Sequence, residues 1–471
     1  MPRTGCVRKK LGKPVGAVSR IGRRGPYGRG VPDTRPPAPG RDREIARLAI
    51  PALGALVAEP LFLLADSAVV ATLGTAPLAG LGAAAVVLST AVGMCVFLAY
   101  GTTAVSARLV GAGDRAGALA RGVDGMWLAA GLGVALAVAG WLSAGWLVRA
   151  LGASEAVAPY AETYLRISMA GLPAVLLALA ATGLLRGLQD TRTPLAVTVV
   201  AVTANLALDL LFVLGLEWGI AGSAWASVLA QWGAAAAYLL IVARQARRLR
   251  AALGPRPAGI ASSLSLNAAL LARTAALRGV FLLAAAVAAR LGDAELAAYQ
   301  VTMQTWYLLA LALDALAIAG QALTGRDLGS GDAERARATA RRVTWWGFGV
   351  GCALAGLVLL LRPWYGSWFG DDPAVAALIG SALVVVAVHQ PLAGPVFALD
   401  GVLIGAGDAR WLAYAQAASL AVFAPAAWAV LAYDGGLDAL WWALLWFMAV
   451  RGALLGWRAH SGRWAVTGAV R

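Results

Sequence analysis

Residues that bind metals are scarce in this sequence. It has only two histidines, His389 and His460, and neither lies in an HExxH motif or near a cysteine. Its three cysteines, Cys6, Cys95 and Cys352, show no CxxC spacing. A zinc site needs clustered Cys or His ligands, so zinc chemistry is not expected. Cys95 and Cys352 fall within apolar blocks, where we expect them to pack as small apolar residues.

Motifs for nucleotide-driven or hydrolytic chemistry are also missing. No GxxxxGK[ST] loop occurs, which disfavours a process driven by ATP. Nothing in the chain resembles the strand-turn-helix motif that presents a catalytic serine. We therefore expect neither an enzyme nor a bound cofactor.

Charged residues make up only 13% of the chain, whereas 60% of its residues are hydrophobic and the mean hydropathy is +0.73. A soluble domain could not bury so much apolar surface. About twelve apolar blocks are long enough to span a membrane, which predicts an all-α polytopic membrane protein with twelve transmembrane helices. The expected cores of these blocks are 45–70, 77–105, 122–148, 160–184, 194–216, 219–243, 264–289, 296–323, 343–361, 374–399, 410–432 and 437–457.

The formal net charge of +15 raises the possibility of nucleic-acid binding, but the positions of the charges argue against it. Nearly all of the 39 lysines and arginines lie in the first 47 residues or in alternate connections between apolar blocks. The opposite connections hold only Arg149, Arg290 and Arg362. This is the positive-inside pattern, so we expect a multi-pass protein of the plasma or inner membrane with both termini in the cytoplasm.

The two halves of the chain repeat each other. The motif at 111–114 (GAGD) recurs at 329–332 (GSGD), and the same shift of 218 residues places Pro173 on Pro391. Six blocks per half predict two pseudo-symmetric six-helix lobes. The expected parts are a disordered basic arm (1–43), an N-lobe (44–243), a cytoplasmic linker (244–263), a C-lobe (264–457) and a cytoplasmic tail (458–471).

Three polar residues within the N-lobe blocks break this repeat. The shift places Asp66 on Ala284, Asn205 on Phe423 and Asp209 on Ala427. Asn205 and Asp209 are four residues apart and so share one helix face. We expect them to lie at the same depth as Asp66 and to face it across a cavity.

Buried carboxylates in a membrane protein commonly mark ion or proton pathways. Burial and a neighbouring carboxylate both disfavour the charged form. The sequence therefore predicts that Asp66 or Asp209 binds a proton more tightly than an exposed aspartate. The alternative is that both acids merely hydrogen-bond neighbouring helices.

Other acids within the blocks are secondary candidates. Glu59 lies near mid-membrane and has either a coupling or a structural role. Asp314 lies deep within its block and is a possible second site, whereas Asp400 lies near a block end, where we expect it to hold a loop. Arg273 and Arg278 are placed so that one of them can pair with, and so neutralise, one of these acids.

Three stretches together resemble the MATE (multidrug and toxic compound extrusion) family, in its DinF-like branch. They are PALGALVAEPLFLLADSAVVATLG, LRGLQDTRTPL followed by NLALDLLF, and ALDALAIAGQALTGRDLGSGD. The resemblance covers residues 44 to 456 and implies twelve helices in two lobes that export organic cations and amphipathic compounds. It also implies that Asp66, Asn205 and Asp209 form the N-lobe proton or cation site. Pro51 stands where the family has a bend in its first helix.

These observations predict a multidrug antiporter, working as a monomer, that exchanges protons for amphipathic or cationic small molecules. The alternatives are sodium coupling at the same oxygen atoms, a flippase for a lipid-linked precursor, and a membrane protein that transports nothing. A flippase needs an arginine-rich groove, and only Arg166, Arg273 and Arg278 lie within the blocks. Besides its substrate, the partner we expect is membrane lipid, with no nucleic acid and no metal.

Overall fold

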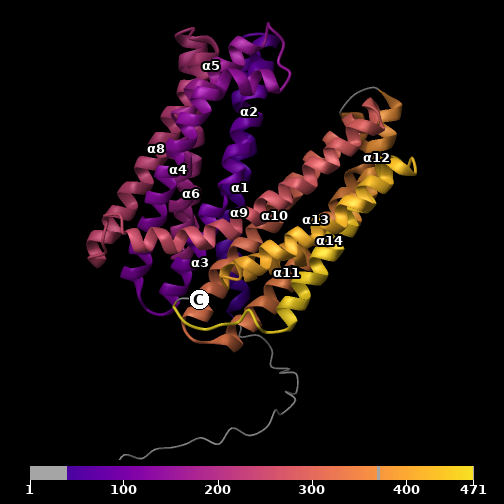
Figure 1. Cartoon of the computed structure of the whole chain (residues 1–471). Coiled ribbons are helices and arrows are strands. Elements are labelled where there is room, and N and C mark those ends of the chain that lie inside the picture. Colours follow the sequence, from indigo (N-terminus) through magenta and orange to yellow (C-terminus); the bar gives the residue numbers. More distant parts are fainter. Residues whose placement is uncertain (1–39, 369–371, 470–471) are drawn as a thin grey trace, which may run out of the picture. The chain divides into compact units, whose positions relative to one another are not determined.

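A computed structural model describes residues 40–368 and 372–469, and within these ranges it contains helices and no strand (Figure 1). Residues 1–39, with Cys6 and most of the predicted arm, lie outside the described part. The first half contains α1 (Arg41–Ala71), α2 (Thr75–Met94), α3 (Phe97–Gly111), α4 (Arg115–Ala150), α5 (Ala158–Met169), α6 (Leu172–Gly187), α7 (Arg192–Asp209), the π-helical turn η1 (Leu210–Gly215) and α8 (Gly219–Leu249). The second half contains α9 (Pro257–Leu291), α10 (Asp293–Gly329), α11 (Ala333–Tyr365), the 3-10 turn η2 (Gly366–Trp368), α12 (Pro373–Gly405), α13 (Ala409–Ala432) and α14 (Gly436–His460).

The predicted twelve spans are confirmed. Eleven helical segments of the described chain are long and apolar enough to cross a membrane, and α5 with α6 makes a twelfth span bent by 50°. Two predicted blocks are less regular than expected: α2 and α3 form one span interrupted at Cys95 and Val96, and the 160–184 block contains the α5–α6 bend. The connection between the halves is irregular only across 250–256.

The first helix begins earlier than its apolar run. Residues 41–43, predicted as arm, already belong to α1, because charged side chains there bind the second half of the chain. Arg41 bonds Asp327 at 3.0 Å, and Asp42 accepts from the Nε of Arg342 at 2.5 Å. These ion pairs extend the helix beyond the point where hydrophobicity alone would start it.

The repeated GxGD motifs end one helix and cap the next in both halves. Gly113 and Gly331 have φ values of +83° and +84°, a left-handed conformation that glycine adopts without strain. The aspartate that follows each accepts from a backbone N–H three residues on, Asp114 from Gly117 at 2.7 Å and Asp332 from Arg335 at 2.8 Å. These aspartates therefore cap the helices that follow the turns.

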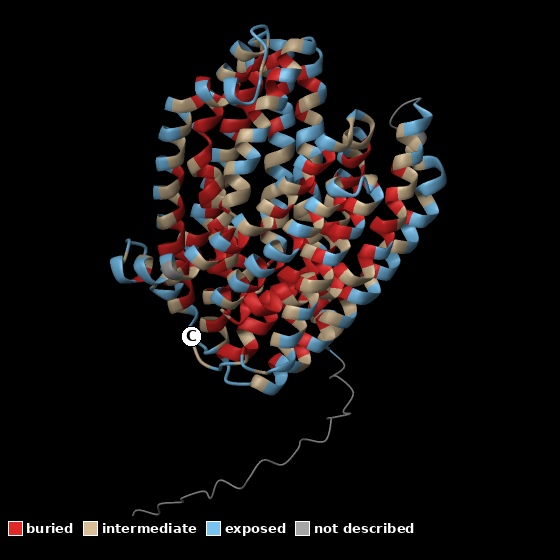
Figure 2. Ribbon diagram, turned by 45° about the vertical axis from the view of Figure 1, so that its right-hand side comes forward, coloured by how far each residue is buried: buried red, intermediate tan, exposed pale blue. Residues whose placement is uncertain are grey.

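The two halves meet where α3 and α10 end. A methyl group at Gly111 would overlap the carbonyl oxygen of Arg326, and one at Gly329 would overlap that of Arg108. Arg108 and Arg326 are themselves related by the shift of 218 residues, so the contact is symmetric. Figure 2 shows buried residues concentrated in the lower middle of the molecule. Among the candidate spans, α10 has the largest share of buried residues in its apolar window, 72%.

The chain end crosses the same junction. Arg108 of α3 donates to the carbonyl oxygens of Ala406, Val466 and Gly468 at 2.8, 3.0 and 3.0 Å. The backbone N–H of Gly468 donates to Leu328 at 3.0 Å. The residues after α14 therefore join the ends of helices from both halves. Of the cysteines, Cys95 is buried as predicted, whereas Cys352 is exposed on α11, so its predicted packing role is wrong.

Candidate functional site

The three polar residues that break the repeat lie together in the first half. Asp66 is near the end of α1, while Asn205 and Asp209 lie on the last two turns of α7. Their exposed fractions are 1%, 1% and 0%. Three polar groups removed from water in this way need partners from neighbouring helices.

Asp66 is held by two hydroxyl groups. Ser223 of α8 donates to Oδ1 at 2.5 Å, and Tyr164 of α5 donates to Oδ2 at 3.1 Å. Both donors are neutral, and no arginine or lysine of the described chain forms an ion pair with this carboxyl group. Asp66 is thus positioned without a permanent countercharge.

Asn205 connects Asp209 to α8. In the amide orientation that satisfies all its partners, Asn205 donates to Oδ2 of Asp209 at 2.9 Å. Its amide oxygen then accepts from the hydroxyl of Ser227 at 3.3 Å and from the Ser227 backbone N–H at 3.1 Å. Asn205 therefore fixes the position of the second carboxyl group.

Both carboxyl groups are anchored to α8, Asp66 through Ser223 and Asp209 through Asn205, which in turn bonds Ser227. The other Asp209 oxygen, Oδ1, is buried and has no hydrogen-bond partner in the described part of the chain. Such an arrangement can hold one proton, or can place several oxygen atoms around a small cation.

An irregular turn follows the site directly. Asp209 is the last residue of α7, and the chain continues as the π-helical turn η1. Phe212 in this turn stacks on Trp218 with ring centroids 4.8 Å apart. The backbone N–H of Trp218 donates to the backbone carbonyl oxygen of Phe212 at 2.9 Å. Wider π turns of this kind are frequent at functional sites. Nothing in the sequence indicated the π turn.

Three residues of the site were missed by sequence reasoning: Tyr164, Ser223 and Ser227. A signal for the two serines was available, because they are four residues apart on α8, the same spacing as Asn205 and Asp209 on α7. When two packed helices each present polar residues at this spacing, the polar residues of one helix can face those of the other. Tyr164 had no comparable signal.

The secondary candidates do not join the Asp66–Asp209 pair. Glu59 is on α1 but its side chain is exposed, with no hydrogen bond or ion pair to another described residue. Asp314 is on α10 in the second half, where its charged neighbours are Asp400, Arg273, Arg186 and Arg451. The structure therefore separates two groups of acids, one in each half.

Asp400 does not hold a loop, and that prediction is wrong. Its carboxylate accepts from the Nε of Arg273 on α9 at 3.2 Å and lies 3.2 Å from the guanidinium of Arg451 on α14. Asp400 thus links three helices at their buried faces, because a charge placed there needs countercharges. Arg273 forms an ion pair with Asp400 and neutralises its charge, as expected of one of the two arginines. The guanidinium of Arg278 instead lies against Gly93 of α2.

Both prolines of the first helix, Pro51 and Pro60, lie within one continuous helix. Each lacks a backbone N–H and so leaves a carbonyl oxygen one turn earlier without its helical partner. Pro60 stands six residues before Asp66. The bend at Pro51 stays a prediction.

A polytopic helical membrane protein with two related halves and a group of buried polar residues in one of them has the architecture of a membrane transporter. The sequence pattern of the MatE family matches residues 51–211 and 272–428. The chain therefore belongs to the MatE family, the family of MATE multidrug transporters.

Individual relatives agree with this assignment. The DNA damage-inducible protein F of Escherichia coli K12 is 30% identical over 90% of this chain and 94% of that protein. Protein DETOXIFICATION 43 of Arabidopsis thaliana is 36% identical over 62% of this chain, and the match spans 55% of the plant protein. The MATE transporter VcmN of Vibrio cholerae in its bent form has the same fold, with a TM-score of 0.79 at 23% identity over 90% of this chain and 96% of that one.

Proposed function

We propose that this MATE transporter exports amphipathic or cationic small molecules in exchange for protons that bind at Asp66 and Asp209. The observation that carries the proposal is the pair of buried carboxyl groups whose hydrogen-bond partners are hydroxyls and an amide rather than arginines. An acid paired with arginine stays ionised, whereas an acid with neutral partners can exchange a proton. The protein acts as a carrier and not as an enzyme.

In the proposed cycle, a proton from outside binds the pair while the site is open to that side. Protonation removes the charge repulsion between the two carboxyl groups, and the hydroxyls of Tyr164 and Ser223 keep Asp66 in place. Release of the proton to the cytoplasm restores the charge and allows substrate to bind again. When an uncharged substrate is exchanged for one proton, one charge moving through 100 mV contributes about 2.3 kcal/mol, enough to sustain a concentration ratio of about fifty, whereas exchange for a monovalent cation is driven by the pH difference.

The test is transport of a fluorescent cation with an imposed proton gradient, measured as uptake into everted vesicles or proteoliposomes. We expect Asp66→Asn and Asp209→Asn each to reduce proton-driven export at least about tenfold at equal membrane abundance. The matched control is Glu59→Gln, which removes an exposed carboxylate from the same helix. Proton-driven export at the normal rate in both Asp variants would contradict the proposal.

Sodium coupling is the second candidate, because the carboxylate, hydroxyl and amide oxygens gathered here are also ligands for hard cations. A sodium gradient without a proton gradient separates the two possibilities. Export under that condition, abolished by Asp209→Asn, would assign sodium as the coupling ion. Export only with a proton gradient would support the proposal.

A precursor flippase is less well supported. Arginines that would bind a pyrophosphate are already engaged: Arg166 bonds Glu162 at 2.7 Å, and Arg273 is held by Asp400. Of these three arginines, Arg278 is the one without an acidic partner among the described residues. A substrate without a pyrophosphate group agrees better with these side chains.

A further inference from the structure

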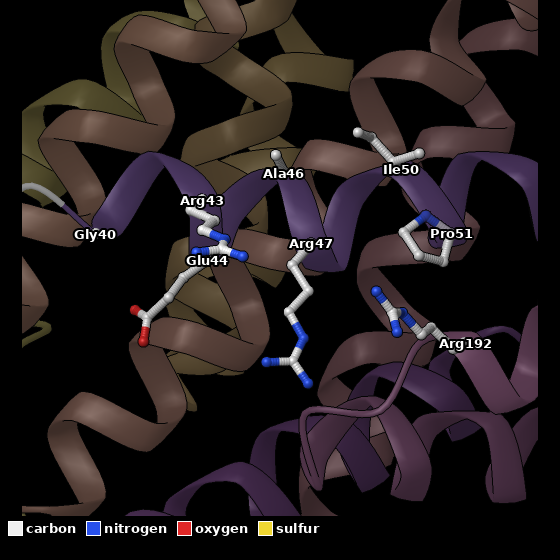
Figure 3. A pocket seen from close by; sticks show the side chains of 8 residues that line it. All are labelled: Gly40, Arg43, Glu44, Ala46, Arg47, Ile50, Pro51 and Arg192. Atoms are coloured by element: carbon white, nitrogen blue, oxygen red, sulfur yellow. The ribbon is translucent and has the colours of Figure 1, made fainter.

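A pocket of about 670 Å³ lies at the base of the first half, between the beginnings of α1 and α7. Figure 3 shows it from close by, with the side chains of Arg47 and Arg192 extending into the same space below α1. This end of the molecule is the one predicted to face the cytoplasm. The pocket is lined by Gly40, Arg43, Glu44, Ala46, Arg47, Ile50, Pro51 and Arg192.

The pocket carries an excess of positive charge. Arg43, Arg47 and Arg192 have exposed side chains, and none forms an ion pair with an acid of the described chain. The pocket's acid, Glu44, bonds Arg41 and Arg326, each at 3.1 Å, so its charge is already balanced outside the pocket. Three guanidinium groups around one space favour a ligand with a charged phosphate.

The surroundings of the pocket are apolar on the side toward the membrane. Ile50 on α1 is 70% exposed and Val200, two turns into α7, is 67% exposed. Both α1 and α7 are candidate membrane spans that begin at the pocket, at Arg41 and Arg192. Charged groups at the start of two spans, with exposed apolar residues beyond them, match the order of headgroup and acyl chain in a lipid leaflet.

The corresponding place in the second half lacks this charge. The shift of 218 residues places Arg43 on Ala261, Arg47 on Ser265 and Arg192 on Arg410. One arginine of three remains there. The general excess of basic residues at this end of the protein therefore does not account for the cluster, which is particular to the first half.

We propose that this pocket binds the headgroup of an anionic phospholipid, with the phosphate among Arg43, Arg47 and Arg192 and an acyl chain along Ile50 and Val200. Bound lipid neutralises the mutual repulsion of the three arginines and links the base of α1 to the base of α7. Pro51 lines the same pocket, so the lipid also contacts the residue at which the first helix is predicted to bend. The proposal does not depend on the coupling ion.

The test uses the purified full chain in a neutral detergent, with phosphatidylglycerol or phosphatidylcholine added. We expect phosphatidylglycerol to raise the melting temperature by about 2 °C or more and phosphatidylcholine to have a smaller effect. The triple variant Arg43→Gln, Arg47→Gln, Arg192→Gln should lose this difference, since the three charges together contribute on the order of a hundredfold in affinity for an anionic lipid. The charge-matched control is Arg115→Gln, Arg337→Gln, Arg410→Gln, which removes three exposed arginines from the same end of the molecule.

Two further measurements separate the alternatives. Inorganic phosphate alone should not reproduce the stabilisation; if it does, the pocket is a site for a free anion and the lipid proposal is wrong. Phospholipid that copurifies with the protein, measured by mass spectrometry, should be depleted of phosphatidylglycerol in the pocket variant and not in the control. If the triple variant does not fold, the same comparison is made with Arg47→Gln against Arg410→Gln. Equal phosphatidylglycerol in both would overturn the proposal.

Discussion

The two halves of the molecule share a backbone plan but differ at the candidate site. The positions of the second half that correspond to Asp66, Tyr164 and Ser223 are Ala284, Ala382 and Trp441, all buried. Phe423 occupies the place of Asn205 and packs against Phe447 with ring centroids 6.0 Å apart. The same location is thus a hydrogen-bonded acid pair in one half and an apolar core in the other.

A second contrast concerns the buried aspartates themselves. Asp66 accepts from neutral hydroxyls, whereas Asp400 is held between the guanidinium groups of Arg273 and Arg451. The two guanidinium groups supply the countercharge for a buried carboxylate at Asp400. In the proposed mechanism, the charge of the partners and not burial alone therefore distinguishes the acid that exchanges a proton from the acid that is structural.

The largest effect on stability is expected at this charged group in the second half. Arg273→Ala would leave Asp400 buried with one partner fewer, and breaking such a pair typically costs 3–5 kcal/mol. We expect a marked loss of thermal stability, with transport per folded molecule preserved. The measurement is the melting temperature together with export normalised to folded protein. Loss of proton coupling at unchanged stability would give the charged group a direct role in transport.

The next effect concerns the junction between the halves. Gly111→Ala places a methyl group against the Arg326 carbonyl oxygen, and overpacking of this kind costs about 1–3 kcal/mol. We expect the ends of α3 and α10 to separate. A cysteine introduced at this junction, in a background without Cys6, Cys95 and Cys352, should then become more accessible to a water-soluble thiol reagent. Gly113→Ala is a poor control, because the positive φ of Gly113 would strain any other residue. Gly131→Ala is the better control, since a methyl group there meets no other atom and should leave the accessibility of the cysteine unchanged. Unchanged accessibility would mean that this contact does not keep the halves together.

The sequence predicted the spans, the repeat and the acid pair because each depends on local signals. Hydrophobic length marks a span, a constant shift reveals the repeat, and the NxxxD spacing places Asn205 and Asp209 on one face. What it did not predict depends on contacts between distant segments. Asp400 was misassigned because its partners, Arg273 and Arg451, are 127 and 51 residues away in the chain. Tyr164 and the π turn after Asp209 are likewise set by packing that no local pattern reports.

A smaller effect is expected from the hydroxyl that holds Asp66. Ser223→Ala removes one hydrogen bond to a buried carboxyl group, which typically costs about 1–3 kcal/mol when the group is charged and less when it is protonated. The protonated form is therefore favoured relative to the wild type, and we expect export to keep its maximum rate but to continue at a higher external pH. The measurement is export against external pH, with Ser227→Ala as the comparison because Ser227 contacts Asn205 rather than Asp66. A shift toward lower pH would mean that Ser223 stabilises the protonated acid.

The smallest effect is expected at Glu59, which lies seven residues before Asp66 on nearly the same face of α1. Because Glu59 forms no hydrogen bond or ion pair with another described residue, Glu59→Gln removes charge without removing an interaction. Changes of this kind are usually within about 0.5 kcal/mol, so export should change by less than about threefold. Export by this variant is measured beside export by Asp66→Asn in the same vesicles. Both acids lie on nearly the same face of α1 but only Asp66 has hydrogen-bond partners, so the comparison shows whether position or partners determine the effect on export. If export falls as far as in Asp66→Asn, protons reach the buried pair through Glu59, and the site extends two turns further along α1.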